Sequence, residues 1–277
     1  MTKGIKMSYA STVKRKDFKH NFLKTIIVRA DFQGVFEPEM QKVLPEVKAW
    51  AKEHGYEYAE KPANHVNIVL NNGLFKSEQN VQKIYSFSNI TNGFTLDVTK
   101  EFVCLKIQTN SYIPFDDYSE IVPEITKLFE SNVTYFSVIR FGLRKINKCC
   151  VANKEYISKL FNNLYVSYYN ELENLTNISS GHTSVFEYSK YKFNYITNIV
   201  KTQKDNKDVY DVAIDIDAYA RDNETVENLM NDVQNQSEVN DLVFKIYKSS
   251  LSEEFIKMLT SDDEICEEIV SGVSRNE

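Results

Sequence analysis

Residues 135–147 read Tyr-Phe-Ser-Val-Ile-Arg-Phe-Gly-Leu-Arg-Lys-Ile-Asn, and this stretch decides how the chain is interpreted. Apolar residues alternate along it with a period of two, which is typical of a β-strand. Ile139, Phe141 and Leu143 then point to one face of the strand. The opposite face carries Val138, Arg140, Gly142 and Arg144. Two guanidinium groups and a glycine on one face of an otherwise apolar strand mark a candidate site.

An unpaired guanidinium group is costly to bury, so this face must meet water, carboxylates or an anionic ligand. In one interpretation, Arg140 and Arg144 form salt bridges with acids of the second half of the chain, such as Asp215 and Asp217. In the other, they bind a ligand, and Gly142 leaves a gap above the sheet for that ligand or for another chain. The candidate ligand-binding residues are Arg140, Gly142, Arg144 and Asn147.

Lys145 is expected to bend towards solvent, whereas Arg144 is expected at an interface between two halves of the chain. Removing one partner of a buried ion pair is strongly destabilising, and exposed lysines contribute little. Arg144→Ala should therefore lower stability more than Lys145→Ala.

Asp211, Asp215 and Asp217 share one face of a second predicted strand, whose other face is apolar. Carboxylates two residues apart on a strand can converge on Mg²⁺. The alternative is a solvated face or one that pairs with arginine, and it is favoured because no third carboxylate pattern supports a metal. Asp215 and Asp217 are thus metal candidates only if the protein is an enzyme.

Composition narrows the class of protein. The chain has 277 residues, 42% of them hydrophobic and 13% aromatic, which is typical of a folded protein. Its net charge of −6 argues against general nucleic-acid binding, which needs a basic surface. We find no apolar run long enough for a membrane span and no signal-peptide core, so a cytoplasmic location without membrane association is expected.

Sequence motifs exclude several common chemistries. The chain contains no HExxH, GxSxG, GxxxxGK[ST] or GxGxxG motif, and its four cysteines form no CxxC pair. Only 8 glycines are available for phosphate-binding loops. We therefore expect no cofactor.

The order of predicted elements indicates an α+β fold with two mixed or antiparallel sheet-plus-helix halves packed together. We divide the chain into a basic N-terminal arm (1–20), an N-terminal half (21–150), a C-terminal half (151–260) and an acidic tail (261–277). The two charged ends are either solvated or paired with each other, within or between subunits. An apolar stripe predicts a helix that starts at Glu37 and ends at His54-Gly55, and other stripes predict helices over 116–130 and from Thr225 to about Ser249.

Residues 139–147 resemble the Arg-x-Gly-Leu-Arg-Tyr-Ile-Asn signature of a sporadically distributed family of prokaryotic proteins of about this length. Residues 22–32 resemble the opening strand of that family, and Asp215-Ile216-Asp217 resembles its Asp-x-Asp strand. Lys145 stands where the family usually has an aromatic residue, and the Trp-x-Phe expected near Tyr85-Ser86-Phe87 is absent, as in a divergent member. The resemblance implies no established activity, and the sporadic distribution is typical of mobile genes such as phage-defence or toxin–antitoxin cargo.

These patterns predict a non-enzymatic binding or regulatory protein that recognises a partner protein or an anionic ligand. The alternative is a Mg²⁺-dependent phosphoryl-transfer or nuclease-like enzyme that uses Asp215 and Asp217 with Arg140 and Arg144. Tyrosine-rich segments at Tyr165 to Tyr169 and Tyr188 to Tyr195 suggest a homodimer or a partner docked on the second half. The rival explanation is that these rings cover the core and keep their hydroxyls wet.

Overall fold

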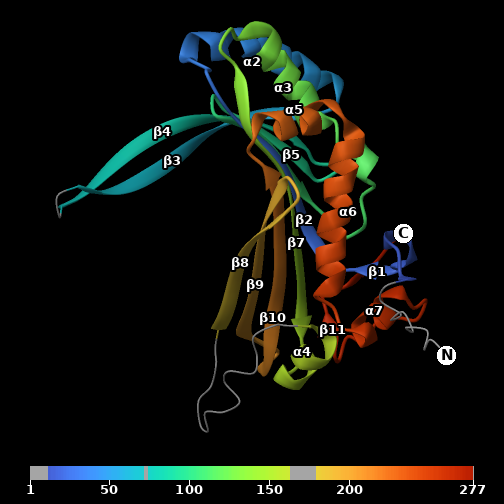
Figure 1. Cartoon of the computed structure of the whole chain (residues 1–277). Coiled ribbons are helices and arrows are strands. Elements are labelled where there is room, and N and C mark those ends of the chain that lie inside the picture. The colour runs from blue at the N-terminus through green and yellow to red at the C-terminus, as the bar shows by residue number, and fades with distance from the viewer. Residues whose placement is uncertain (1–11, 72–73, 163–178, 277) are drawn as a thin grey trace.

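The computed structural model describes residues 12–71, 74–162 and 179–276, with no side-chain description for residues 59–82. One antiparallel sheet forms the body of the protein (Figure 1). Its strands follow the order β3-β4-β5-β6-β2-β7-β10-β9-β8, and the short β11 also pairs with β7. The strands are β2 (Leu23–Gln33), β3 (Glu57–Asn71), β4 (Leu74–Asn89), β5 (Phe94–Val98), β6 (Phe102–Gln108), β7 (Ser137–Val151), β8 (Ser179–Tyr188), β9 (Tyr191–Lys204), β10 (Lys207–Ala220) and β11 (Val270–Ser271).

The arginine-bearing strand, β7, lies at the centre of this sheet, between β2 and β10. Gly142 of β7 is flanked by Arg29 of β2 and by Tyr219 of β10. Arg144 is flanked on the β10 side by Asp217. Residues opposite each other in paired strands lie on the same side of a sheet, so this register brings the charges of three strands together.

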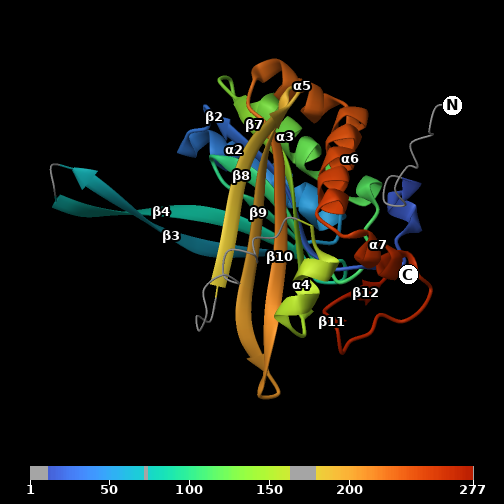
Figure 2. The same ribbon diagram turned by 60° about the horizontal axis from the view of Figure 1, so that its bottom comes forward.

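Four helices lie against one face of the sheet (Figure 2). They are α2 (Glu37–Glu53), α3 (Ile121–Asn132), α5 (Asn223–Asn231) and α6 (Val233–Ser249). Two shorter helices, α4 (Lys154–Leu160) and α7 (Glu253–Thr260), pack against each other near the end of β7. We call the side under the four helices the covered face. The opposite side, over which no described helix lies, is the open face.

The core lies between the sheet and these helices. On β2, Ile26, Val28 and Ala30 are buried against the helix layer, whereas the alternate residues remain partly exposed. The predicted stripe of α2 is confirmed, because its buried residues are Met40, Val43, Leu44, Val47 and Ala51.

The two halves of the chain continue into each other through one sheet. In the first half, β2 is central and β6, β5, β4 and β3 follow outward; in the second, β7 is central and β10, β9 and β8 follow outward. Each half thus starts with a central strand and returns beside it before entering its last helices. The predicted α+β class is confirmed, and the halves meet through the ladder between β2 and β7 rather than through two separate sheets.

The described part of the basic arm and the acidic tail pair with each other within the chain. β1 (His20–Asn21) pairs with β12 (Ser274–Arg275), and the Asn276 amide donates to the Lys19 carbonyl at 2.7 Å. Lys19 Nζ also lies 3.6 Å from Asp262, although both side chains are largely exposed. Side chains add further contacts between the ends: His20 Nε2 lies 3.1 Å from the Asp263 carbonyl oxygen, and Asn276 Nδ2 donates to the Phe18 carbonyl at 2.8 Å.

Several predicted boundaries differ from the structure. The helix expected over 116–130 is a short 3-10 turn, η2 (Phe115–Asp117), followed by α3 from Ile121. The helix expected from Thr225 is broken at Asp232, whose carboxylate accepts from the amide of Gln234 and starts α6. No helix in the described ranges is both long and apolar enough to cross a membrane.

Candidate functional site

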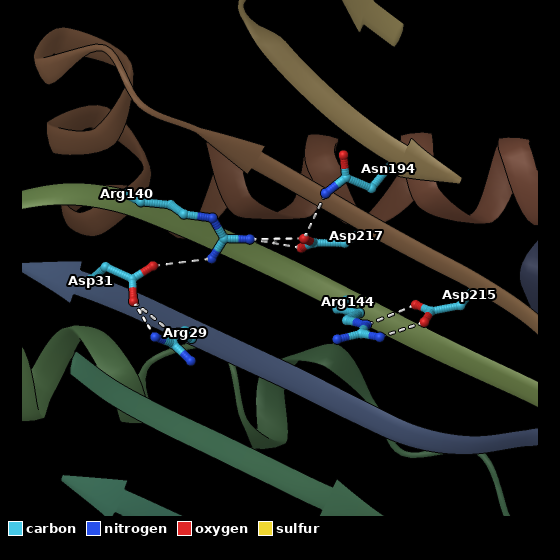
Figure 3. A network of polar contacts seen from close by, with 7 residues as sticks. All are labelled: Arg29, Asp31, Arg140, Arg144, Asn194, Asp215 and Asp217. Carbon is cyan, nitrogen blue, oxygen red and sulfur yellow. Dashed lines mark hydrogen bonds and ion pairs between the residues drawn. The ribbon is translucent and has the colours of Figure 1, made fainter. Parts of the chain in front are cut away.

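The open face carries a network of charges that spans β2, β7, β10 and β9 (Figure 3). The strand pairings and the period of two place these residues on one side, because the charged residues of each strand are an even number of positions apart: two on β2 and on β10, and four on β7. We call this set the open-face network: Arg29, Asp31, Arg140, Arg144, Asn194, Asp215 and Asp217.

Arg140 is the centre of the network. Its Nη2 donates to both carboxylate oxygens of Asp217, at 3.0 and 2.9 Å, and its Nη1 lies 3.4 Å from Asp31 Oδ2. Asn194 of β9 donates to the same Asp217 at 3.3 Å. The side chains of Arg140 and Asp217 are only 15% and 18% exposed. A guanidinium group this enclosed depends on its carboxylates, so this pair is a structural element of the sheet.

Arg144 forms a separate pair with Asp215. Its Nε and Nη2 donate to the two carboxylate oxygens at 2.8 and 2.5 Å, the two-pronged geometry that favours arginine over lysine. Hydrogen bonding to Asp215 raises the pKa of Arg144. The Arg144 side chain is 40% exposed, so this pair is more open to solvent than that of Arg140.

Gly142 provides room for Arg140. A Cβ at position 142 would lie 3.0 Å from Arg140 Nη2 and 3.1 Å from the Ala218 carbonyl oxygen. The Arg140 guanidinium also lies over the ring of Tyr219, with 4.7 Å between the guanidinium carbon and the ring centroid. The space over the glycine is therefore occupied by the neighbouring arginine, whereas one of the two interpretations of the sequence predicts a gap there for a ligand or another chain.

Asn147 does not belong to this face. It lies on the covered face, is 5% exposed, and its Nδ2 donates to the Ile214 carbonyl at 3.4 Å. The reason is parity, because positions 140 and 147 are an odd number of residues apart on one strand.

Lys145 is also on the covered face, where its Nζ donates to Asn240 Oδ1 of α6 at 2.6 Å. The expectation that Lys145 bends towards solvent is thus wrong.

The two metal candidates, Asp215 and Asp217, are both engaged by arginine on the open face. In the described ranges, no group of three or more His, Cys, Asp or Glu residues is placed to hold a metal ion. A neighbouring thiol, Cys104 of β6, is no ready nucleophile, because burial raises its pKa to about 11. Among the described residues, the charged side chains of the open-face network are therefore paired with one another.

Sequence reasoning missed three members of the network. Arg29 and Asp31 alternate on β2, and Arg29 pairs with Asp31 at 2.6 Å while lying over the ring of Phe102. Their period-two spacing within an apolar strand is the same signal that singled out Arg140. Asn194 carried no such signal, because only the register between β9 and β10 brings it to Asp217.

The tyrosine-rich segments are only partly described. Residues 165–169 lie outside the described residues. In the second segment, Tyr188 is 56% exposed and faces solvent, whereas Tyr191 is 3% exposed and packs in the core. Val185 of β8 and Val200 of β9 lie on the open face beside the network and are 65% and 40% exposed.

Comparison of the chain with protein-family models and with curated proteins finds no match.

Proposed function

We propose that this chain is a non-enzymatic binding protein that recognises a partner protein through the open face of its sheet. The observation that carries the proposal is the open-face network: seven polar residues on four strands are held in fixed positions on a face that no described helix covers.

Two further observations support a protein partner. Exposed aliphatic side chains, Val185 and Val200, flank the network, and apolar contacts around fixed polar groups are what protein interfaces use. The charges of the network balance, with three arginines against three aspartates. A balanced face favours a mixed protein surface over a strongly anionic ligand.

The enzyme alternative has no comparable support. Mg²⁺ at Asp215 and Asp217 would have to displace Arg144 and Arg140 from both carboxylates. It would then leave a largely enclosed guanidinium group without its main partner, which is costly.

The resemblance to the prokaryotic family with the Gly-Leu-Arg signature and the cytoplasmic location remain proposals of the same kind. The structure of a member with the complete signature would test the first. It should show a central strand whose two signature arginines pair with an Asp-x-Asp strand, as β7 does with β10.

The test compares three forms of the tagged chain as baits in an extract of the native host. Val185→Glu places a charge on the open face, and Lys42→Glu changes an exposed residue of α2 on the other side of the molecule. We expect a protein that co-purifies with the wild type and with Lys42→Glu but not with Val185→Glu. Capture that is equal with all three baits, or no capture, would contradict the proposal. Light scattering of the pure chain identifies the case in which the partner is a second copy.

A further inference from the structure

The covered face holds a charge of a different kind. Lys145 lies at the centre of the sheet, between Ile26 of β2 and Ile216 of β10, and beneath α6. Its ammonium group carries three donors, and Asn240 Oδ1 accepts its only hydrogen bond among the described residues. No carboxylate of these residues forms an ion pair with it. Lys145 is not fully buried, and part of its surface remains exposed.

A second cation lies beside it. Arg15, in the 3-10 turn η1 (Arg15–Asp17), donates from Nη2 to the Asn240 carbonyl at 2.8 Å, so both cations bind the same residue of α6. Arg15 lies over the ring of Phe244 and pairs with Asp241 at 3.1 Å. The Asp241 side chain is 75% exposed, so water screens much of its charge.

The charge at this place is therefore unbalanced. Burial and the positive charge of Arg15 together lower the pKa of Lys145 to about 7, and Asp241 opposes them only as the weakest of the three causes. A buried hydroxyl lies near the same arginine. Tyr118 is 1% exposed, its hydroxyl has no hydrogen-bond partner among the described residues, and it is close enough to Arg15 for that charge to act on its pKa.

We propose that Lys145 and Arg15 form a binding site for a small oxyanion, a phosphate or a carboxylate, between β7, α6 and the N-terminal turn. An anion would balance the charge of Lys145, which no carboxylate of the described residues pairs with, and would accept from the ammonium N–H groups that do not bind Asn240. Charge-assisted hydrogen bonds are the strongest that these side chains form. The site is on the opposite face from the open-face network, so the inference does not depend on the proposed function.

The experiment measures thermal unfolding of the full chain with inorganic phosphate, with acetate and with chloride at matched ionic strength. At about pH 6, where Lys145 is charged, we expect phosphate or acetate to raise Tm above that in chloride by about 3 °C. At about pH 9 the amine is neutral, and the difference should disappear. The anion that acts distinguishes a phosphate site from a carboxylate site.

Variants assign the effect to these residues. Lys145→Met retains the volume of the side chain, and Arg15→Gln changes only a residue of the outer turn; each should abolish the anion-dependent shift. Lys127→Gln, an exposed residue of α3, should retain it. No shift with either anion in the wild type, or an equal shift in Lys145→Met, would overturn the proposal.

Discussion

The two faces of β7 hold their charges in opposite ways. On the open face, Arg140 and Arg144 each bind both oxygens of one β10 carboxylate, Arg140 through Nη2 alone and Arg144 through Nε and Nη2. On the covered face, Lys145 meets only the amide oxygen of Asn240. A charged side chain on a face open to solvent stays charged when it has an oppositely charged partner. A lysine under a helix either binds an anion or has a lowered pKa and loses its proton. The comparison predicts opposite responses to mutation and to pH.

The largest effect is expected where an enclosed charge loses its partner. Asp217→Asn retains the shape of the side chain but removes the carboxylate that holds Arg140, which is 15% exposed. We expect the free energy of unfolding to fall by about 2–3 kcal/mol, somewhat below the cost for a fully buried pair. Urea denaturation measures this change. Asp215→Asn is the matched control, because its partner Arg144 is 40% exposed, and it should cost less. Equal losses would mean that exposure does not separate the two pairs.

Lys145 should make stability depend on pH in the alkaline range. Its pKa is lowered to about 7 in the folded chain, from the ordinary value of 10.5. Between these two values the unfolded chain binds one more proton than the folded chain, so the free energy of unfolding rises with pH. Below about pH 7 both states are protonated, and the full penalty of the buried charge is present.

Lys145→Met should therefore reduce the rise of stability between about pH 7 and about pH 10 by up to about 1.4 kcal/mol per pH unit. Denaturation at several pH values in a buffer without phosphate measures this slope. Lys148→Met, at an exposed position of the same strand, should leave the slope unchanged. A slope that is the same in Lys145→Met and the wild type would show that the amine is not the titrating group.

A substitution at Gly142 tests whether Arg140 needs the space that the absence of a side chain at position 142 leaves free. Gly142→Ala should destabilise the chain by about 1–2 kcal/mol, because the new methyl group would crowd the Arg140 guanidinium and the Ala218 carbonyl. The same substitution in an Arg140→Ala background should cost less, since one of the three crowded groups is gone; the third is Tyr219 Cβ, at 3.1 Å. An equal cost in both backgrounds would place the strain on Ala218 and Tyr219 of β10.

The sequence predicts much of this arrangement through periodicity. The period of two identified β7 and the face of its arginines, and the pairing of Arg140 and Arg144 with Asp215 and Asp217 was one of two interpretations that the residues allowed. Parity also places Lys145 and Asn147 with Phe141 and Leu143 on the covered face. The polarity of both side chains suggests the opposite face, so position along the strand is the better guide to their placement than polarity.

Other features depend on contacts that no local pattern contains. The register between β7 and β10 places Asp217 opposite Arg144, yet Asp217 pairs with Arg140 and Asp215 with Arg144, so the pairs are set by side chains that reach along the strands. Asn240 binds both Lys145 and Arg15 only because α6 packs against β7 and the N-terminal turn, although residues 15 and 240 are far apart in sequence. That Arg144→Ala lowers stability more than Lys145→Ala remains a prediction, but exposure of Lys145 cannot be the reason for it, because Lys145 lies under α6.

The smallest effect concerns the exposed pair. A double-mutant cycle with Arg144→Ala and Asp215→Ala should give a coupling energy of about 1 kcal/mol or less at low salt, the range of partly exposed ion pairs. Salt should reduce this energy further, because solvent screens charges that it can reach. The matching cycle of Arg140 and Asp217 should be larger and should respond less to salt, since both side chains are enclosed. Urea denaturation at low and high salt measures both cycles. A strongly salt-sensitive Arg140–Asp217 coupling would show that this pair is as solvated as Arg144–Asp215, and the contrast within the open face would then disappear.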